Sequence, residues 1–169
     1  MRKLLDGLYM KSAALAAFFL VGLLIMVLLS IVGRQIGFYV PGTDAYAGYL
    51  MAGSGFLALA HTLKRGEHIR VTLILHHLSG WPRRWLELWA LGAGATLSLL
   101  FAWYSIRLVW QSHLFNDIST STDATPLWLP QLGMAIGTMV MAIACLDELV
   151  LEWRGLRTAT PAGESLRNE

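Results

Sequence analysis

Five histidines and a single cysteine are the side chains of this sequence that could hold a metal ion or a haem. A haem between membrane helices needs histidines on facing helices. His61 ends one apolar segment and His113 follows another, at opposite sides of a membrane, so about 30 Å of helix rise separates them. His76 and His77 are adjacent and would point in different directions on a helix. Cys145 has no second cysteine with which to form a disulfide or a metal site. We therefore interpret the histidines as polar residues of the membrane interface, and we expect no metal and no cofactor.

Catalytic patterns are also missing from the sequence. It contains no nucleophile–base pair, no phosphate-binding glycine loop and no HExxH zinc motif, so we do not expect an enzyme. The positive charges cluster at the ends of apolar segments and form no stripe, which argues against nucleic acid as a partner. Arg107 is the one Lys, Arg, Asp or Glu within the apolar segments, and it lies one turn from the end of its segment, close enough to reach the interface. The chain by itself therefore shows no pathway for an ion or a substrate.

Long apolar segments dominate the chain. Hydrophobic residues make up 56% of the sequence and charged residues only 14%, against about 25% charged in soluble domains. About 20 apolar residues in a helix cross a bilayer core. The sequence predicts an all-α integral membrane protein with four spans, at residues 12–33, 45–63, 88–110 and 127–146. The first segment is longer than the apolar region of a signal peptide, so we expect it to be a retained anchor.

The remaining segments are polar or amphipathic. Residues 69–79 place Val71, Ile74, Leu75 and Leu78 at helical spacing, which predicts a short helix lying in the cytoplasmic interface. We expect one four-helix membrane domain over residues 1–157 and a polar cytoplasmic tail over residues 158–169.

The distribution of lysine and arginine predicts the orientation. The N-terminal segment carries three of these residues, the connection between the second and third spans carries five, and the C-terminal segment carries three. These segments lie on one side of the membrane and hold eleven of the thirteen cations, whereas Arg34 and Arg107 lie on the other. By the positive-inside rule, both termini should be cytoplasmic.

Small residues recur along the predicted spans. Gly133 and Gly137 form a GxxxG motif in the fourth span, which allows close approach of two helix backbones in lipid. The third span has a similar face (Ala90, Gly94, Ser98, Ala102), and so does the second (Gly48, Ala52, Gly55). Such faces serve either packing among the four helices or contact with a partner.

Two stretches resemble the small membrane subunit, DctQ type, of tripartite ATP-independent periplasmic (TRAP) transporters. That family shows an acidic turn before its second helix and an R-R-G-x-H-I/V-R-V-D-L segment after it. Here residues 41–50 contain Asp44, and residues 64–73 read Lys-Arg-Gly-Glu-His-Ile-Arg-Val-Thr-Leu. Residues 126–130 read Pro-Leu-Trp-Leu-Pro, which is similar to the P-x-W-x-P segment that opens the family's fourth helix. Ala45 and Thr72 depart from the family by replacing acids that members often carry.

The resemblance implies a multi-pass protein of the bacterial inner membrane. It implies three kinds of partner: a large permease subunit of the DctM type, a periplasmic substrate-binding protein and membrane lipids. The implied function is to scaffold the large subunit during sodium-coupled uptake of a small organic anion. The alternative is a membrane anchor subunit of a respiratory complex, either haem-free or haem-binding.

Ten residues are candidates for contact with lipid or with a partner subunit. They are Arg34, Asp44, Lys64, Arg65, His68, Arg70, Arg107, Trp128, Gly133 and Gly137. Of these, Lys64, Arg65 and Arg70 are expected to lie beside lipid phosphates on the cytoplasmic side, where each charge contributes about 1 kcal/mol.

The predicted orientation can be tested by cysteine labelling. In a Cys145→Ser background, Glu67→Cys should not react with a membrane-impermeant maleimide when the inner membrane is intact, because residue 67 is predicted to be cytoplasmic. Thr120→Cys, in the predicted outer connection, is the control and should react. Labelling of position 67 from outside would contradict the orientation.

Overall fold

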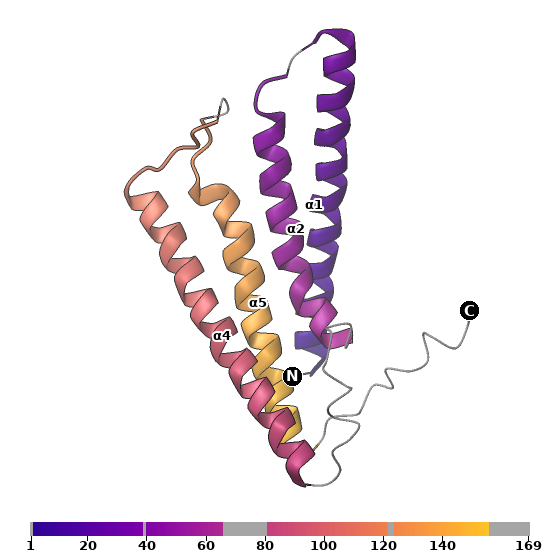
Figure 1. Ribbon diagram of the computed structural model, residues 1–169, viewed down its shortest axis with the longest axis vertical. Coiled ribbons are helices and arrows are strands. Elements are labelled where there is room, and N and C mark those ends of the chain that lie inside the picture. Colours follow the sequence, from indigo (N-terminus) through magenta and orange to yellow (C-terminus); the bar gives the residue numbers. More distant parts are fainter. Residues whose placement is uncertain (1, 39, 66–80, 122–123, 156–169) are drawn as a thin grey trace, which may run out of the picture.

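The computed structural model describes residues 2–38, 40–65, 81–121 and 124–155. Four helices account for most of them: α1 (Arg2–Ile36), α2 (Thr43–Arg65), α4 (Trp81–Leu114) and α5 (Trp128–Trp153). Successive helices run in opposite directions, so the start of α1 and the end of α5 lie at the same end of the molecule (Figure 1). The predicted all-α architecture is confirmed for the described residues, whereas the predicted interfacial helix 69–79 and the tail 158–169 lie outside them.

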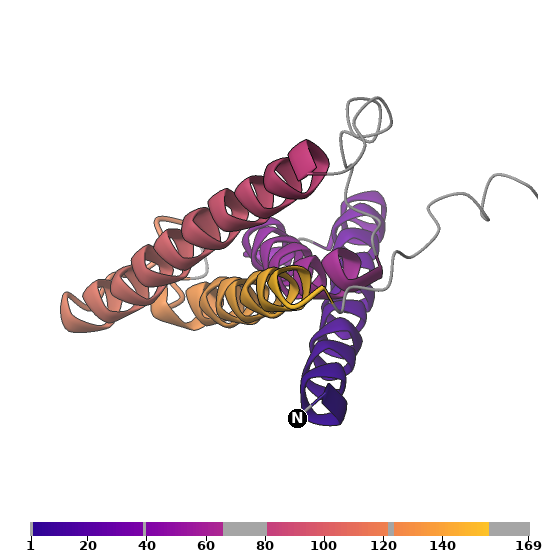
Figure 2. The same cartoon turned by 90° about the horizontal axis from the view of Figure 1, so that it is seen from below.

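The helices form an open row in the order α1, α2, α5, α4. Helix α2 packs against α1 and α5, and α5 packs against α2 and α4. The outer helices α1 and α4 diverge on either side of this central pair, as the view along the helices shows (Figure 2). Because each outer helix has one main neighbour, most of its apolar surface remains exposed, including Phe18 on α1 and Leu97 on α4.

Three of the described helices are long and apolar enough to cross a membrane: Leu4–Ile36, Arg84–Leu114 and Trp128–Trp153. They contain the first and third predicted spans, and the fourth predicted span except for its first residue, Leu127. Helix α2 has 23 residues, about 34 Å, but is not among the three. Its central position explains this difference, since α1 and α5 cover surface that would otherwise face lipid. Hydroxyl groups are tolerated there because Ser54 and Thr62 donate hydrogen bonds to the backbone of α2 itself.

The helices extend past the predicted apolar spans into polar sequence. Helix α1 begins at Arg2, ten residues before the predicted span, and α4 begins at Trp81, seven residues before it. Pro82 lies in the first turn of α4, where the missing N–H group costs little. The apolar pattern predicts only the part of a helix that lies in lipid. The backbone hydrogen bonds continue beyond that part, so the helix is longer than the span.

The centre of the row depends on glycines that let backbones approach closely. A Cβ atom on Gly137 would lie 2.5 Å from the carbonyl carbon of Phe56 and 2.8 Å from the backbone nitrogen of Leu57. One turn earlier on α5, a Cβ on Gly133 would lie 3.3 Å from the Cα of Gly53. The GxxxG motif of α5 therefore packs against the backbone of α2, within the chain.

Helix α1 joins this contact from the other side of α2. The ring of Phe19 lies against Gly53, so closely that a Cβ on Gly53 would overlap it at 2.5 Å. The Ser12 hydroxyl donates a buried hydrogen bond of 2.6 Å to the carbonyl of Leu57, a residue only 1% exposed. Gly53 and Leu57 are thus contacted by both α1 and α5, and they form the centre of the three-helix core.

The small-residue face predicted for the second span does not take part in this core. Gly48, Ala52 and Gly55 are exposed, and no atom lies within 4 Å of a Cβ built on either glycine. The packed face of α2 instead carries Gly53, Ser54, Leu57 and Ala60. On α4, Ala102 is buried against the row but Ala90 is exposed.

We expect Gly137→Ala to destabilise the protein by about 1–3 kcal/mol, because the added methyl group must push α2 and α5 apart. Gly55→Ala is the matched control. Its methyl group meets open space, and replacing glycine in a helix should be neutral or stabilising by up to about 1 kcal/mol. Unfolding of both variants in detergent, followed by circular dichroism, measures the difference. Equal stabilities would contradict the backbone contact.

Candidate functional site

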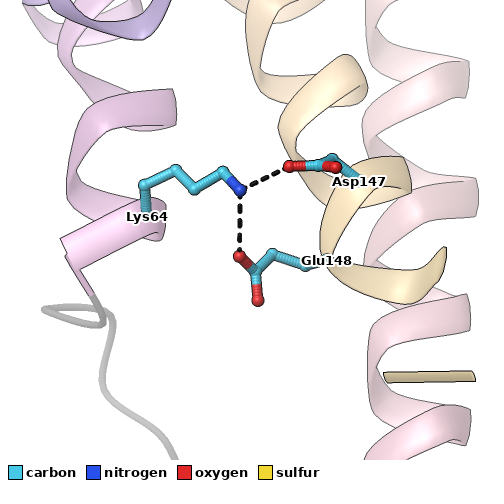
Figure 3. Close-up of polar contacts among 3 residues, drawn as sticks. All are labelled: Lys64, Asp147 and Glu148. Atoms are coloured by element: carbon cyan, nitrogen blue, oxygen red, sulfur yellow. Dashed lines mark hydrogen bonds and ion pairs between the residues drawn. The ribbon is translucent and has the colours of Figure 1, made fainter. Parts of the chain in front are cut away.

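An ion cluster joins α2 to α5 at the end of the molecule where both termini lie. The ammonium group of Lys64, in the last turn of α2, pairs with the carboxylate of Asp147 and lies 3.4 Å from that of Glu148 (Figure 3). All three side chains are largely buried, with exposures of 21%, 20% and 11%. Adjacent acids on one helix normally point apart, but here both carboxylates turn toward the same cation.

Helix α1 completes the surroundings of this cluster. The Tyr9 ring is 3% exposed, and the Lys64 nitrogen lies 5.3 Å from its centroid, within the range of a cation–π interaction. Beneath it, Tyr9 packs with Ala60, Val140 and Ala144 in an apolar cluster. The Tyr9 hydroxyl is buried and has no hydrogen-bond partner among the described residues. The cluster thus brings together α1, α2 and α5 at one point.

The protonation state of Lys64 follows from its partners. Burial of the ammonium group lowers its pKa, but the hydrogen bond to Asp147 and the negative charges of Asp147 and Glu148 outweigh burial. The pKa of Lys64 is therefore raised above its ordinary value, and the side chain remains a cation. A cation shared by two carboxylates holds the helices together, and it offers neither a nucleophile nor a base for catalysis.

A second network lies at the opposite end of the helices. The hydroxyl groups of Tyr46 and Tyr49, at the start of α2, form hydrogen bonds of 3.1 and 2.8 Å with Thr125 and Ser119 of the α4–α5 connection. Within that connection, the Ser119 N–H donates a hydrogen bond of 2.8 Å to the Thr125 carbonyl. One end of α2 is thus bonded to α5 by an ion cluster, and the other end is bonded to the α4–α5 connection by hydroxyl hydrogen bonds.

The candidate residues from the sequence fall into separate places. Arg34 lies in the last turn of α1 and Arg107 on α4, and both are exposed. Asp44, in the first turn of α2, accepts a long hydrogen bond of 3.4 Å from Ser30 of α1. Trp128 begins α5 and packs edge-on against His113, with 5.4 Å between ring centroids.

The other candidates divide between the core and the residues outside the description. Gly133 and Gly137 lie in the α2–α5 contact, and Lys64 forms the ion cluster. Arg65 ends α2, but its side chain is outside the description, as are His68 and Arg70. His61 and His113 belong to the ends of α2 and α4 that lie at opposite ends of the molecule (Figure 1). The described residues contain no group of three His, Cys, Asp or Glu side chains that could hold a metal ion.

Sequence reasoning did not identify Tyr9, Asp147 and Glu148 as parts of a site. A signal was present, because Asp147 and Glu148 end one apolar segment and Lys64 ends another on the same predicted side of the membrane. Opposite charges at equal depth on two helices are natural partners. The sequence did not show that the two helices are neighbours.

Comparison with known proteins gives two matches. A family model described as "Tripartite ATP-independent periplasmic transporters, DctQ component" matches residues 23–155, from within α1 to the end of α5. The chain is also similar to the C4-dicarboxylate TRAP transporter small permease protein DctQ of Rhodobacter capsulatus, with 30% identity over 89 residues. That alignment covers 52% of this chain and 38% of the relative, so it spans well under half of the relative's length. The anchor-subunit alternative has no support from these matches.

We expect Lys64→Met to destabilise the protein by about 1–3 kcal/mol, because it leaves two partly buried carboxylates without their cation. Lys11→Met, which removes an exposed lysine from α1, is the control and should change stability by less than about 0.5 kcal/mol. Unfolding in detergent measures both. Adding Asp147→Asn to Lys64→Met should cost less than the sum of the single changes. Additive costs would show that the pair is not coupled.

Proposed function

Because the chain belongs to the DctQ component family of the tripartite ATP-independent periplasmic transporters, and is a multi-pass inner-membrane component of a transport system, we propose that it scaffolds a large permease subunit. In this proposal a DctM-type permease carries the substrate and ion sites, and a periplasmic binding protein delivers the substrate. The transported solute is a small organic anion taken up with sodium. The relative's name specifies C4-dicarboxylates, which belong to that chemical class.

The observation that carries the proposal is the fixed centre of the row between two exposed apolar helices. Three contacts hold α2: the Gly137 backbone contact, the Ser12 hydrogen bond and the Lys64 ion cluster. In lipid, such close packing and interhelical polar contacts are what hold helices together. A subunit built in this way suits a part that remains still while another part of the transporter moves.

The distribution of charge supports the same role. No Asp, Glu, Lys or Arg occurs within residues 12–33, 45–63 or 127–146, and in residues 88–110 only Arg107 does. Transport sites in membrane proteins normally require ionisable or polar groups that face a cavity inside the bilayer. The side chains that bind sodium and the anion are therefore assigned to the partner subunit.

The proposed arrangement has four spans with both termini in the cytoplasm. The Lys64 cluster then lies near the inner surface, and the Tyr46–Thr125 and Tyr49–Ser119 bonds lie near the periplasm. Arg34, Asp44, Arg107 and Trp128 belong to the outer side, where they are available to lipid, to the large subunit or to the binding protein.

We expect the purified chain alone to give no uptake in liposomes under an inward sodium gradient with candidate organic anions. The same liposomes should take up substrate when the large permease and the binding protein are added. Sodium-dependent uptake by this chain alone would refute the scaffold role.

Substrate preference separates a scaffold from a lining of the pathway. In the complete transporter, Gly137→Leu should lower co-purification of the two subunits and the uptake rate together, while the ratio of rates for competing anions stays constant. A changed ratio would place this subunit in the substrate pathway.

A further inference from the structure

A pocket outside the ion cluster lies between the first turns of α4 and the end of α5. Its walls are Trp81, Arg84, Trp85, Leu88 and Trp153, and its volume is about 220 Å³. Three of the five side chains are indoles, and each of them is more than 60% exposed. This pocket combines one arginine with aromatic and aliphatic side chains. Its residues belong neither to the ion cluster nor to the glycine contacts between α2 and α5.

Arg84 is held in place by the end of α5. Its Nη2 atom donates a hydrogen bond of 3.2 Å to the carbonyl of Trp153. Gly155, with φ of +65°, turns the chain there, and a Cβ on it would lie 3.8 Å from the same nitrogen atom. A guanidinium group has five N–H donors. Among the described residues, the Trp153 carbonyl accepts a hydrogen bond from one of the Arg84 nitrogens. Donors therefore remain for a further acceptor in a side chain that is already positioned.

The tryptophans give the pocket the character of a membrane interface. The Trp81 and Trp85 rings pack with their centroids 5.9 Å apart on α4, and Trp153 lies across from them on α5. Indoles prefer the zone between acyl chains and headgroups, because they are apolar with one polar group. Leu88 continues the lining toward the apolar part of α4.

The charges around the pocket favour an anion. Arg154 is exposed and directly follows Trp153, which lines the pocket. The acids near the pocket, Glu87 and Glu152, each have an interaction partner of their own. Arginine suits phosphate because its planar fork can donate two parallel hydrogen bonds. A zwitterionic headgroup would bring an amine close to Arg154, whereas an anionic headgroup would not.

We propose that this pocket binds the headgroup phosphate of an anionic glycerophospholipid from the cytoplasmic leaflet. Arg84 holds the phosphate, the three indoles surround the glycerol region, and the acyl chains run past Leu88 along the exposed apolar side chains of α4. The leaflet follows from the orientation proposed above, whereas the lipid site itself does not depend on it.

The test is lipid binding to the full-length chain in detergent, measured by native mass spectrometry with phosphatidylglycerol and phosphatidylcholine as probes. The wild-type chain should prefer phosphatidylglycerol. Arg84→Gln should weaken its binding about tenfold, the loss expected for a charge-assisted hydrogen bond. Lys11→Gln removes an exposed positive charge from α1, which does not line the pocket, and should leave binding unchanged. Equal losses in the two variants, or none in Arg84→Gln, would overturn the site.

Two further measurements address the lining and the source of the phosphate. Trp81→Leu with Trp85→Leu should weaken phosphatidylglycerol binding, because the indoles contact the lipid. Inorganic phosphate in large excess should not displace the lipid from the wild-type chain, and displacement would overturn the lipid assignment in favour of a free phosphate site. This competition needs no variant, so it decides the question even if Arg84→Gln does not fold. A negative result leaves the scaffold proposal untouched, because that is tested by uptake.

Discussion

Lipid tails are as apolar as leucine, so burying a leucine between two helices in a bilayer gains little over leaving it in lipid. Helices in such a solvent associate where their backbones approach closely and where polar groups find partners. In this chain that constraint is met at one place above all, where Gly137 of α5 lies against the backbone of Phe56 and Leu57 of α2. The same segment of α2 accepts the Ser12 hydrogen bond from α1. The positions of three helices depend on this contact.

The two ends of α2 determine how far the helices can slide along or rotate about this contact. At its C-terminal end, Lys64 lies between two carboxylates of α5 and against the Tyr9 ring of α1. At its N-terminal end, Tyr46 and Tyr49 form hydrogen bonds with the α4–α5 connection. Contacts near the middle of α2 and at both of its ends therefore restrain its sliding and rotation. Among the four described helices, α2 is the one that is not apolar enough to be a candidate membrane span.

The outer helices contrast with this centre. Helices α1 and α4 each have one main neighbour and present apolar side chains over most of their length. In a transporter subunit these faces meet lipid or another subunit, and either surrounding satisfies them because both are apolar. With the proposed lipid bound, the aromatic pocket at the start of α4 would hold the subunit at one depth in the membrane. A rigid centre, broad apolar flanks and an interfacial anchor together suit a part that resists movement.

Much of this was determined by sequence alone, because apolar length and charge placement are local properties. Four helices, the polar ends, and the close-packing role open to Gly133 and Gly137 follow from residue order, and the 126–130 and 64–73 segments indicated the family that the comparisons then confirmed. The tertiary structure decided what depends on neighbours. It selected Gly53 rather than Gly48 or Gly55 as the contact on α2, because all three lie on one helix and only the placement of α1 and α5 distinguishes its faces. It joined Lys64 to Asp147 and Glu148, 83 and 84 residues away, and it showed that the row is open. Periodicity specifies that a helix has a small or charged face, but only packing decides which other helix that face meets.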